Sequence, residues 1–164
     1  MLFKPLAFIT IALSAFQVRA ATTAPEIIKS LTSIASQTVQ LQKVIDSLNA
    51  SNLDTVAPSI PNRITLLYGL TKDLSDDIKD FRDLELSDND VVSIGDTLKA
   101  LISADIDLEE SILFKQKFLS QTLQIEGKTP LLGQLLDLLT KDLQILGKLL
   151  GLMLQIPMNL VIGH

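Results

Sequence analysis

Apolar residues recur at intervals that alternate between four and three along two long stretches of this 164-residue chain. In an α-helix, this spacing places every apolar residue on one narrow face, because 3.6 residues make one turn. The first series is Ile27, Leu31, Ile34, Thr38, Leu41, Ile45 and Leu48. The second series is Ile60, Ile64, Leu67, Thr71, Leu74, Ile78 and Phe81. The pattern predicts an all-α fold.

The ends of these two helices carry capping signals. Thr23 followed three residues later by Glu26 is a capping-box pattern, which predicts the start of the first helix. Residues 49–58 are rich in Asn, Ser, Asp and Pro, which is typical of a connection, and Ser59 offers a cap for the second helix. Two matched helices joined by a short connection predict an antiparallel helical hairpin.

A third apolar series follows the capping-box pattern formed by Ser87 and Asp90. Its members are Val91, Ile94, Leu98, Leu101, Leu108, Ile112, Leu119 and Leu123. The series permits one long helix, but Asp105 and Glu109 fall near its apolar face, and an average helix has about a dozen residues. The pattern therefore favours a break or bend near residues 104–108.

The last segment, residues 131–155, differs because it carries two apolar series. One series is Leu132, Leu136, Leu139, Leu143, Leu146, Leu150 and Met153, and the other is Leu131, Leu135, Leu138, Ile145, Leu149 and Leu152. A thin polar edge remains, formed by Asp137, Lys141, Asp142, Gln144 and Lys148. A helix with two apolar series must be covered on two sides or leave one side exposed. We expect an antiparallel bundle of four to five amphipathic helices with a long leucine-rich last helix.

The first 20 residues have the features of a secretory signal peptide. Lys4 supplies a positive charge, residues 6–16 form an apolar stretch too short to span a membrane, and small residues near Ala20 suit cleavage. The sequence therefore predicts a signal peptide over residues 1–20 and one secreted domain over residues 21–164. Cleavage would leave 12 basic residues against 19 acidic ones, so the formal net charge would change from −5 to −7.

This composition narrows the classes of partner. A negatively charged chain without basic clusters is a poor ligand for nucleic acid, because phosphate binding needs concentrated Lys and Arg. No nucleic-acid partner and no transmembrane segment in the mature chain are expected. Cysteine is absent, so helix packing alone must stabilise a small secreted domain of a size that often needs disulfides.

The residues that support catalysis are scarce. His164, the final residue, is the only histidine, and neither cysteine nor a Gly-x-Ser-x-Gly motif is present. The sequence predicts no enzyme activity and no cofactor.

A group of aspartates suggests calcium, but interleaved basic residues favour a solvated helix side with local ion pairs, so no metal site is predicted. The group comprises Asp73, Asp76, Asp77, Asp80 and Asp83.

Three smaller features add expectations. Asn49-Ala50-Ser51 is an acceptor sequon, which makes Asn49 a candidate for glycosylation. Gly147 and Gly151 could make room for a ligand, but a close contact between helices is the favoured interpretation. The aromatic residues near the apolar faces are expected in the core, and these are Tyr68, Phe114 and Phe118.

The mature chain as a whole resembles the fungal hydrophobic-surface-binding and cell-wall galactomannoprotein family, most specifically in its C-terminal third. The resemblance lies in the turn Gly127-Lys128-Thr129-Pro130-Leu131, in the spaced leucines around Thr140-Lys141-Asp142-Leu143, and in Ile156-Pro157 after the helix. It implies a secreted or wall-associated helical bundle that adsorbs to hydrophobic surfaces or binds fatty acids between helices. A long Ser/Thr-rich tail and anchor signal are missing, so free secretion is expected rather than covalent attachment to the wall.

The sequence and the resemblance lead to one functional expectation and one alternative. We expect a secreted, extracellular protein that binds a fatty-acid-like lipid or a hydrophobic surface. The candidate lipid-binding residues are Leu67, Leu74, Phe118, Leu139, Leu143, Leu146 and Leu150. The alternative is a structural or interaction protein of the fungal cell wall or host interface with no lipid ligand. The ligand, the oligomeric state, and the choice between an enclosed cavity and an exposed patch stay open.

Overall fold

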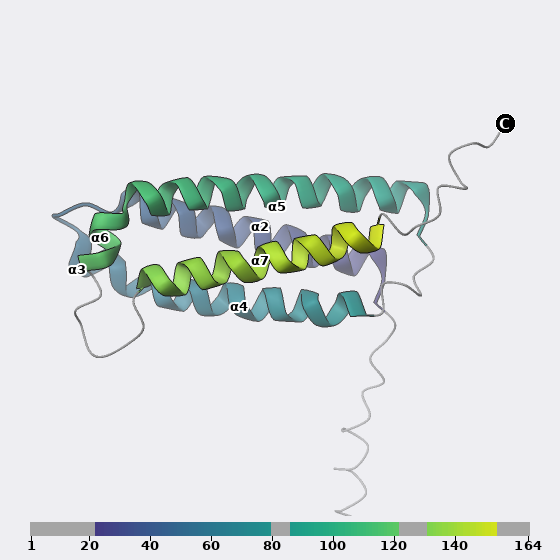
Figure 1. The fold of residues 1–164 in the computed structure, drawn as a ribbon, viewed down its shortest axis with the longest axis horizontal. Helices are drawn as coiled ribbons and strands as arrows, with labels where there is room; N and C mark the ends of the chain where they lie inside the picture. Colours follow the sequence, from purple (N-terminus) through teal and green to yellow (C-terminus); the bar gives the residue numbers. More distant parts are fainter. Residues whose placement is uncertain (1–21, 80–85, 122–130, 154–164) are drawn as a thin grey trace, which may run out of the picture.

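The computed structural model describes residues 22–79, 86–121 and 131–153, where four long helices lie side by side (Figure 1). These helices are α2 (Ala24–Ser47), α4 (Ile60–Asp77), α5 (Asp88–Phe114) and α7 (Leu131–Met153). Short helical segments accompany them: α3 (Leu53–Val56), the 3-10 helix η1 (Ala57–Ser59) and α6 (Gln116–Gln121). The part of the chain so described contains no strand, which confirms the all-α prediction. The expected signal peptide falls outside these ranges.

Each long helix runs antiparallel to the long helix that precedes it in the chain (Figure 1). Helix α2 packs against α4 and α5, and α7 packs against the same two helices. The predicted hairpin of the first two helices is therefore confirmed. Because directions alternate, α4 and α7 are parallel neighbours, and the antiparallel bundle ends with the long leucine-rich helix that the sequence predicts.

The first two apolar series form the centre of the core. Every member of the first series is buried, including Thr38, and so is every member of the second series from Ile60 to Ile78. Phe81 falls outside the described residues. In the third series, the residues from Ile94 to Ile112 and Leu119 are buried as well. A fully buried Leu or Ile side chain stabilises a fold by about 1.5–3 kcal/mol, so packing of this kind stabilises a chain without disulfides.

Two of the three predicted caps are confirmed. The Glu26 carboxylate accepts hydrogen bonds from the backbone N–H and the hydroxyl of Thr23 at 2.8 and 2.9 Å. Ser87 and Asp90 form the corresponding pair before α5. The prediction for Ser59 was wrong, because its hydroxyl donates to the Val56 carbonyl at 2.8 Å instead. Residues 53–59 are already helical, so α4 does not begin after an extended residue that could cap it.

The predicted break near residues 104–108 was also wrong. Helix α5 continues to Phe114 and ends at Lys115, whose φ of −96° and ψ of 8° separate it from α6. The Lys115 ammonium donates to the Leu48 carbonyl at 2.7 Å and lies 5.5 Å from the centre of the Phe114 ring. This contact holds the end of α5 against the end of α2. The helix accommodates Asp105 by burying it and leaves Glu109 exposed.

Candidate functional site

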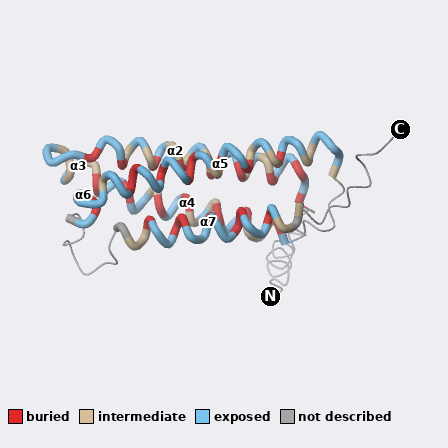
Figure 2. The backbone as a smooth tube through the Cα atoms, turned by 45° about the horizontal axis from the view of Figure 1, so that its top comes forward, coloured by how far each residue is buried: buried red, intermediate tan, exposed pale blue. Residues whose placement is uncertain are grey.

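Buried and exposed residues alternate along helix α7 (Figure 2), and the exposed residues on one flank are apolar. Leu135, Asp142 and Leu149 are buried at intervals of seven on the inner face. Each is followed by an exposed leucine, which therefore stands about 100° around the helix from the core. We call these three leucines the outer strip: Leu136 (48% exposed), Leu143 (61%) and Leu150 (44%). The last helix is thus covered on one side and open on another.

The seven candidate lipid-binding residues occupy different environments. Four of them belong to the packed core, namely Leu67, Leu74, Leu139 and Leu146. Leu143 and Leu150 lie on the outer strip, and Phe118 is half-buried. The seven side chains therefore differ in how far they are exposed. Leu143 and Leu150, which lie on the outer strip, are the members of this set that are exposed to a ligand.

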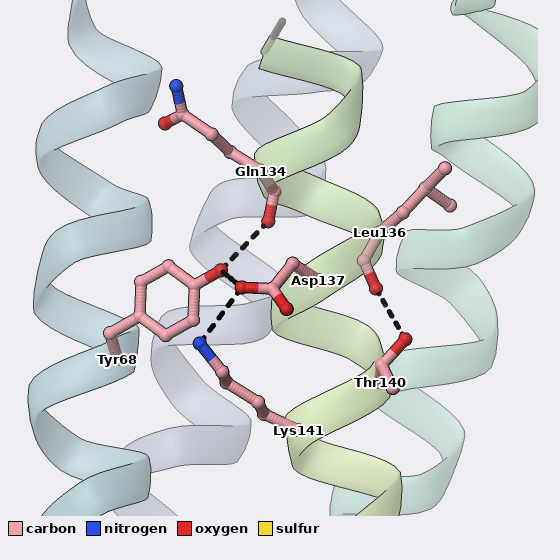
Figure 3. A network of polar contacts seen from close by, with 6 residues as sticks. All are labelled: Tyr68, Gln134, Leu136, Asp137, Thr140 and Lys141. Carbon is pink, nitrogen blue, oxygen red and sulfur yellow. Dashed lines mark hydrogen bonds and ion pairs between the residues drawn. The ribbon is translucent and has the colours of Figure 1, made fainter. Parts of the chain in front are cut away.

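The outer strip is free of charge along its length. Thr140 and Gly147 lie between its leucines at helical spacing, and the Thr140 hydroxyl donates to the Leu136 carbonyl at 2.8 Å (Figure 3). On the neighbouring helix α5, large apolar side chains are also exposed, including Ile106 and Leu113. Exposed apolar surface marks interaction sites when it forms a contiguous patch, and the three leucines of the outer strip lie in one line along α7.

Two expectations near this surface were wrong. A Cβ atom added at Gly147 or Gly151 would meet nothing within 4 Å, so these glycines make no close contact between helices. The prediction of a core position also fails for Phe114, which is 83% exposed, because it lies two residues, about 200° around the helix, after the buried Ile112 and so faces away from the core. Tyr68 is half-buried.

The opposite flank of α7 is polar and contacts α4 through Tyr68 (Figure 3). The Tyr68 hydroxyl lies 2.6 Å from Asp137 Oδ2, to which it donates, and 3.2 Å from the Gln134 carbonyl. The Lys141 ammonium donates to the same Asp137 oxygen at 2.9 Å and lies 4.3 Å from the centre of the Tyr68 ring. Burial, followed by the hydrogen bond to Asp137, raises the pKa of Tyr68. The hydrogen bonds from Tyr68 and Lys141 lower the pKa of Asp137.

A buried polar layer crosses the bundle, with one residue from each long helix: Thr38, Thr71, Asp105 and Asp142. Thr38 and Asp105 lie nine residues before the ends of α2 and α5, and Thr71 and Asp142 lie eleven residues after the starts of α4 and α7. At 1.5 Å per residue, all four are about 14–17 Å from the same end of the bundle. The Thr71 hydroxyl donates to Asp142 Oδ1 at 2.7 Å.

The two carboxyl groups of the polar layer are poorly compensated. Among the described residues, both oxygens of Asp105 and Oδ2 of Asp142 have no hydrogen-bond partner, and neither does the Thr38 hydroxyl. Burial, followed by repulsion from Asp142, raises the pKa of Asp105 to about 7. Burial raises the pKa of Asp142 to about 6 against the opposing effect of the Thr71 hydrogen bond. The two carboxyl groups therefore titrate between mildly acidic and neutral pH.

The position of Asp142 corrects the polar edge expected from the sequence, since Asp142 faces the core. The sequence contains a signal for the burial of Asp142. The series Leu131, Leu135, Leu138, Ile145, Leu149 and Leu152 has a gap of seven between Leu138 and Ile145, and Asp142 fills that gap at the alternating spacing. The same reading places Asp105 in the gap between Leu101 and Leu108.

The other candidate sites can be located only in part. Among residues 22–79, 86–121 and 131–153, no group of three or more His, Cys, Asp or Glu side chains is arranged to hold a metal ion. Asp73 is exposed and Asp76 pairs with Lys79, while Asp80 and Asp83 lie outside the described residues. His164 is outside them as well, so the structure does not test the expected absence of catalysis.

The sequon residue Asn49 is exposed in the turn after α2. Its side-chain oxygen accepts from the Ser51 backbone N–H at 2.9 Å, and its side-chain nitrogen donates to the Ser47 carbonyl at 3.2 Å. The position is open to solvent, as a glycosylation site requires.

No helix in the described part of the chain is long and apolar enough to span a membrane. No family model matches the chain, and no curated protein or solved structure matches it. The candidate site is therefore defined by its own geometry, which places the outer strip and the polar flank on two sides of α7.

Proposed function

We propose that this chain is a secreted, non-catalytic protein that binds lipids, such as fatty acids, or hydrophobic surfaces. It would belong to the hydrophobic-surface-binding family that its C-terminal third resembles. The observation that supports this proposal is the outer strip, in which Leu136, Leu143 and Leu150 remain exposed in a line along α7. Core packing does not account for these residues, because the inner face of the same helix already supplies the core.

The outer strip has enough apolar surface to drive adsorption. Complete burial of a leucine gains about 1.5–3 kcal/mol, and these side chains are about half exposed, so each would contribute about 1 kcal/mol on contact. Three such contributions give about 3 kcal/mol, or about a hundredfold in a binding constant. The lack of charge between the leucines means that this contact would not desolvate an ionised group.

Adsorption to octyl-coated beads tests the proposal. The variant Leu143→Ser/Leu150→Ser removes two members of the outer strip, which are 61% and 44% exposed. The matched control is Leu66→Ser/Val92→Ser, which replaces side chains that are 48% and 62% exposed on other helices. We expect the first variant to adsorb about thirtyfold more weakly than the control, because it loses two contributions of about 1 kcal/mol each. Equal adsorption of the two variants would rule out the outer strip as the binding surface.

The alternative, an interaction protein of the cell wall or host interface, uses the same outer strip against another protein. Light scattering on the purified chain distinguishes the two functions. A tight dimer that the Leu143→Ser/Leu150→Ser variant dissociates, without adsorption to octyl beads, would favour the alternative. A monomer that adsorbs to the beads would favour the proposed function.

A further inference from the structure

A cleft of about 430 Å³ opens between the parallel helices α4 and α7, on the polar flank away from the outer strip. Its sides carry three lysines, Lys72, Lys141 and Lys148, and its inner part is formed by Tyr68, Thr71 and Ile145. Ile145 and Thr71 are buried, and Tyr68 is half-buried. We call this feature the lysine cleft. Its volume is within the range of about 300–1,000 Å³ that small-molecule sites occupy.

The charges in the lysine cleft are only partly compensated. Lys141 pairs with Asp137 at 2.9 Å, and the same contact holds it 4.3 Å from the centre of the Tyr68 ring (Figure 3). Lys72 and Lys148 are exposed, and no hydrogen bond or ion pair to another described residue satisfies either ammonium. Two positive charges thus stand beside an apolar inner wall made by the tyrosine ring and the isoleucine.

The lysine cleft is positively charged, whereas the protein as a whole is negatively charged. The chain has a formal net charge of −5. A second cleft of the same volume, between α2 and α4, carries Glu26, Asp73 and Asp77 beside the single cation of Lys29. An anion would therefore be repelled from the second cleft and attracted to the lysine cleft.

We propose that the lysine cleft binds the head group of an anionic single-chain amphiphile. Lys72 and Lys148 pair with the anionic oxygens, and the first part of the alkyl chain lies against Tyr68 and Ile145. The proposal rests on the proposed function, because it assigns to the lipid ligand a charge class and a head-group site separate from the outer strip. It differs from that function in predicting selection by charge, which adsorption through the outer strip does not require.

The geometry also explains how the wall of the lysine cleft is kept in place. The Tyr68 hydroxyl is fixed by Asp137 and the Gln134 carbonyl, so the ring has a defined orientation between α4 and α7. Thr71 donates its hydroxyl to Asp142 in the polar layer, which leaves no unpaired donor from this residue facing the alkyl chain. The contacts that Lys72 and Lys148 offer are exposed, so binding is weakened by salt.

Calorimetric titration with sodium laurate below micelle-forming concentrations tests the proposal. The test variant Lys72→Gln/Lys148→Gln removes the two cleft cations that no other described residue pairs with, and the control Lys43→Gln/Lys99→Gln removes two exposed cations from α2 and α5. We expect the test variant to bind laurate about 3- to 10-fold more weakly than the control, which should bind as the original chain does. Lys72→Arg/Lys148→Arg should keep the affinity.

Dodecyltrimethylammonium, which has the same alkyl chain and a positive head group, provides the second arm. The proposal expects it to bind more weakly than laurate. Equal binding of the two amphiphiles, equal laurate affinity in the test and control variants, or no binding of laurate at low ionic strength would each overturn the proposal. Octyl-bead adsorption by the same samples distinguishes failure of the lysine-cleft proposal from failure of the proposed function. If the samples still adsorb to the beads, only the lysine-cleft proposal fails. If they do not adsorb, the proposed function fails as well. A thermal melt of each variant establishes that it is folded.

Discussion

Replacing Asp105 by asparagine should make this protein more stable at neutral pH. The carboxyl group of Asp105 is buried, and neither of its oxygens has a hydrogen-bond partner in the part of the chain that the structure describes. Its pKa of about 7 in the folded chain is about three pH units above its ordinary value of 3.8. One pH unit corresponds to about 1.4 kcal/mol, so ionising Asp105 in the folded protein costs about 4 kcal/mol.

The direction of the pH dependence follows from proton binding. Between about pH 4 and pH 7, the folded state holds the Asp105 proton and the unfolded state releases it. The contribution of Asp105 to stability is therefore fully present at the acidic end and is lost as the pH rises towards about 7. Asp142 has a pKa raised to about 6, so it contributes a dependence of the same sign over a narrower window. Because the two carboxyl groups repel each other, their contributions are coupled and do not simply add.

An asparagine at position 105 stays neutral and removes the larger part of the pH dependence of the free energy of unfolding. Its amide is still buried without partners, which costs about 1–3 kcal/mol. The protonated carboxyl group of Asp105 is equally buried and unpartnered, so at about pH 4 the difference should be within about 1 kcal/mol, and the net gain at about pH 8 should be about 3–5 kcal/mol. The matched control is Asp107→Asn, an exposed position on the same helix, which should leave stability within about 0.5 kcal/mol.

Urea unfolding followed by circular dichroism at several pH values measures the effect. The original chain should lose stability as the pH rises from about 4 to 7, and Asp105→Asn should show a much smaller loss. If the two proteins lose stability in parallel, or if the variant is less stable at about pH 8, Asp105 does not carry an uncompensated buried charge and the reasoning fails.

Other substitutions test the packing. Gly147→Ala should stabilise the protein by about 0.5–1 kcal/mol in thermal unfolding, because alanine favours the helix and its Cβ has open space. Leu139→Ala should cost about 2–5 kcal/mol in urea unfolding, whereas Leu143→Ala should change stability by less than about 1 kcal/mol, since only the first is buried. Thr71→Val should remove the hydrogen bond to Asp142 and raise the pKa of that carboxyl further, which a titration followed by NMR would detect.

The spacing of apolar residues was sufficient to predict the inner faces of the helices. The alternation of four and three placed Ile27 to Leu48 and Ile60 to Ile78 in the core, and capping boxes located the starts of α2 and α5. These features depend on local backbone geometry and on a period of 3.6 residues, which are properties of each helix by itself.

Properties that depend on neighbouring helices were harder to predict. Leu139 and Leu143 belong to the same apolar series, yet one is buried and the other exposed. Which of two apolar series faces the core depends on the rotation of α7 about its own axis, which α4 and α5 determine. The end of α5 likewise depends on the contact from Lys115 to the Leu48 carbonyl, 67 residues away in the chain.

The polar layer specifies the register of α7 along α4, which the leucines of α7 do not. Leucines recur at almost every third or fourth position of α7, so sliding this helix by one turn along α4 would still bring leucines against the core. Such a shift would separate Asp142 from the Thr71 hydroxyl, its one hydrogen-bond donor at 2.7 Å, and leave both of its oxygens without a partner in the core. A buried polar contact can fix the register of packed helices in this way, at some cost in stability. The same register aligns Tyr68 with Asp137 and brings Lys72 and Lys148 to one cleft, so the layer that weakens the core at neutral pH also maintains the arrangement of the lysine cleft.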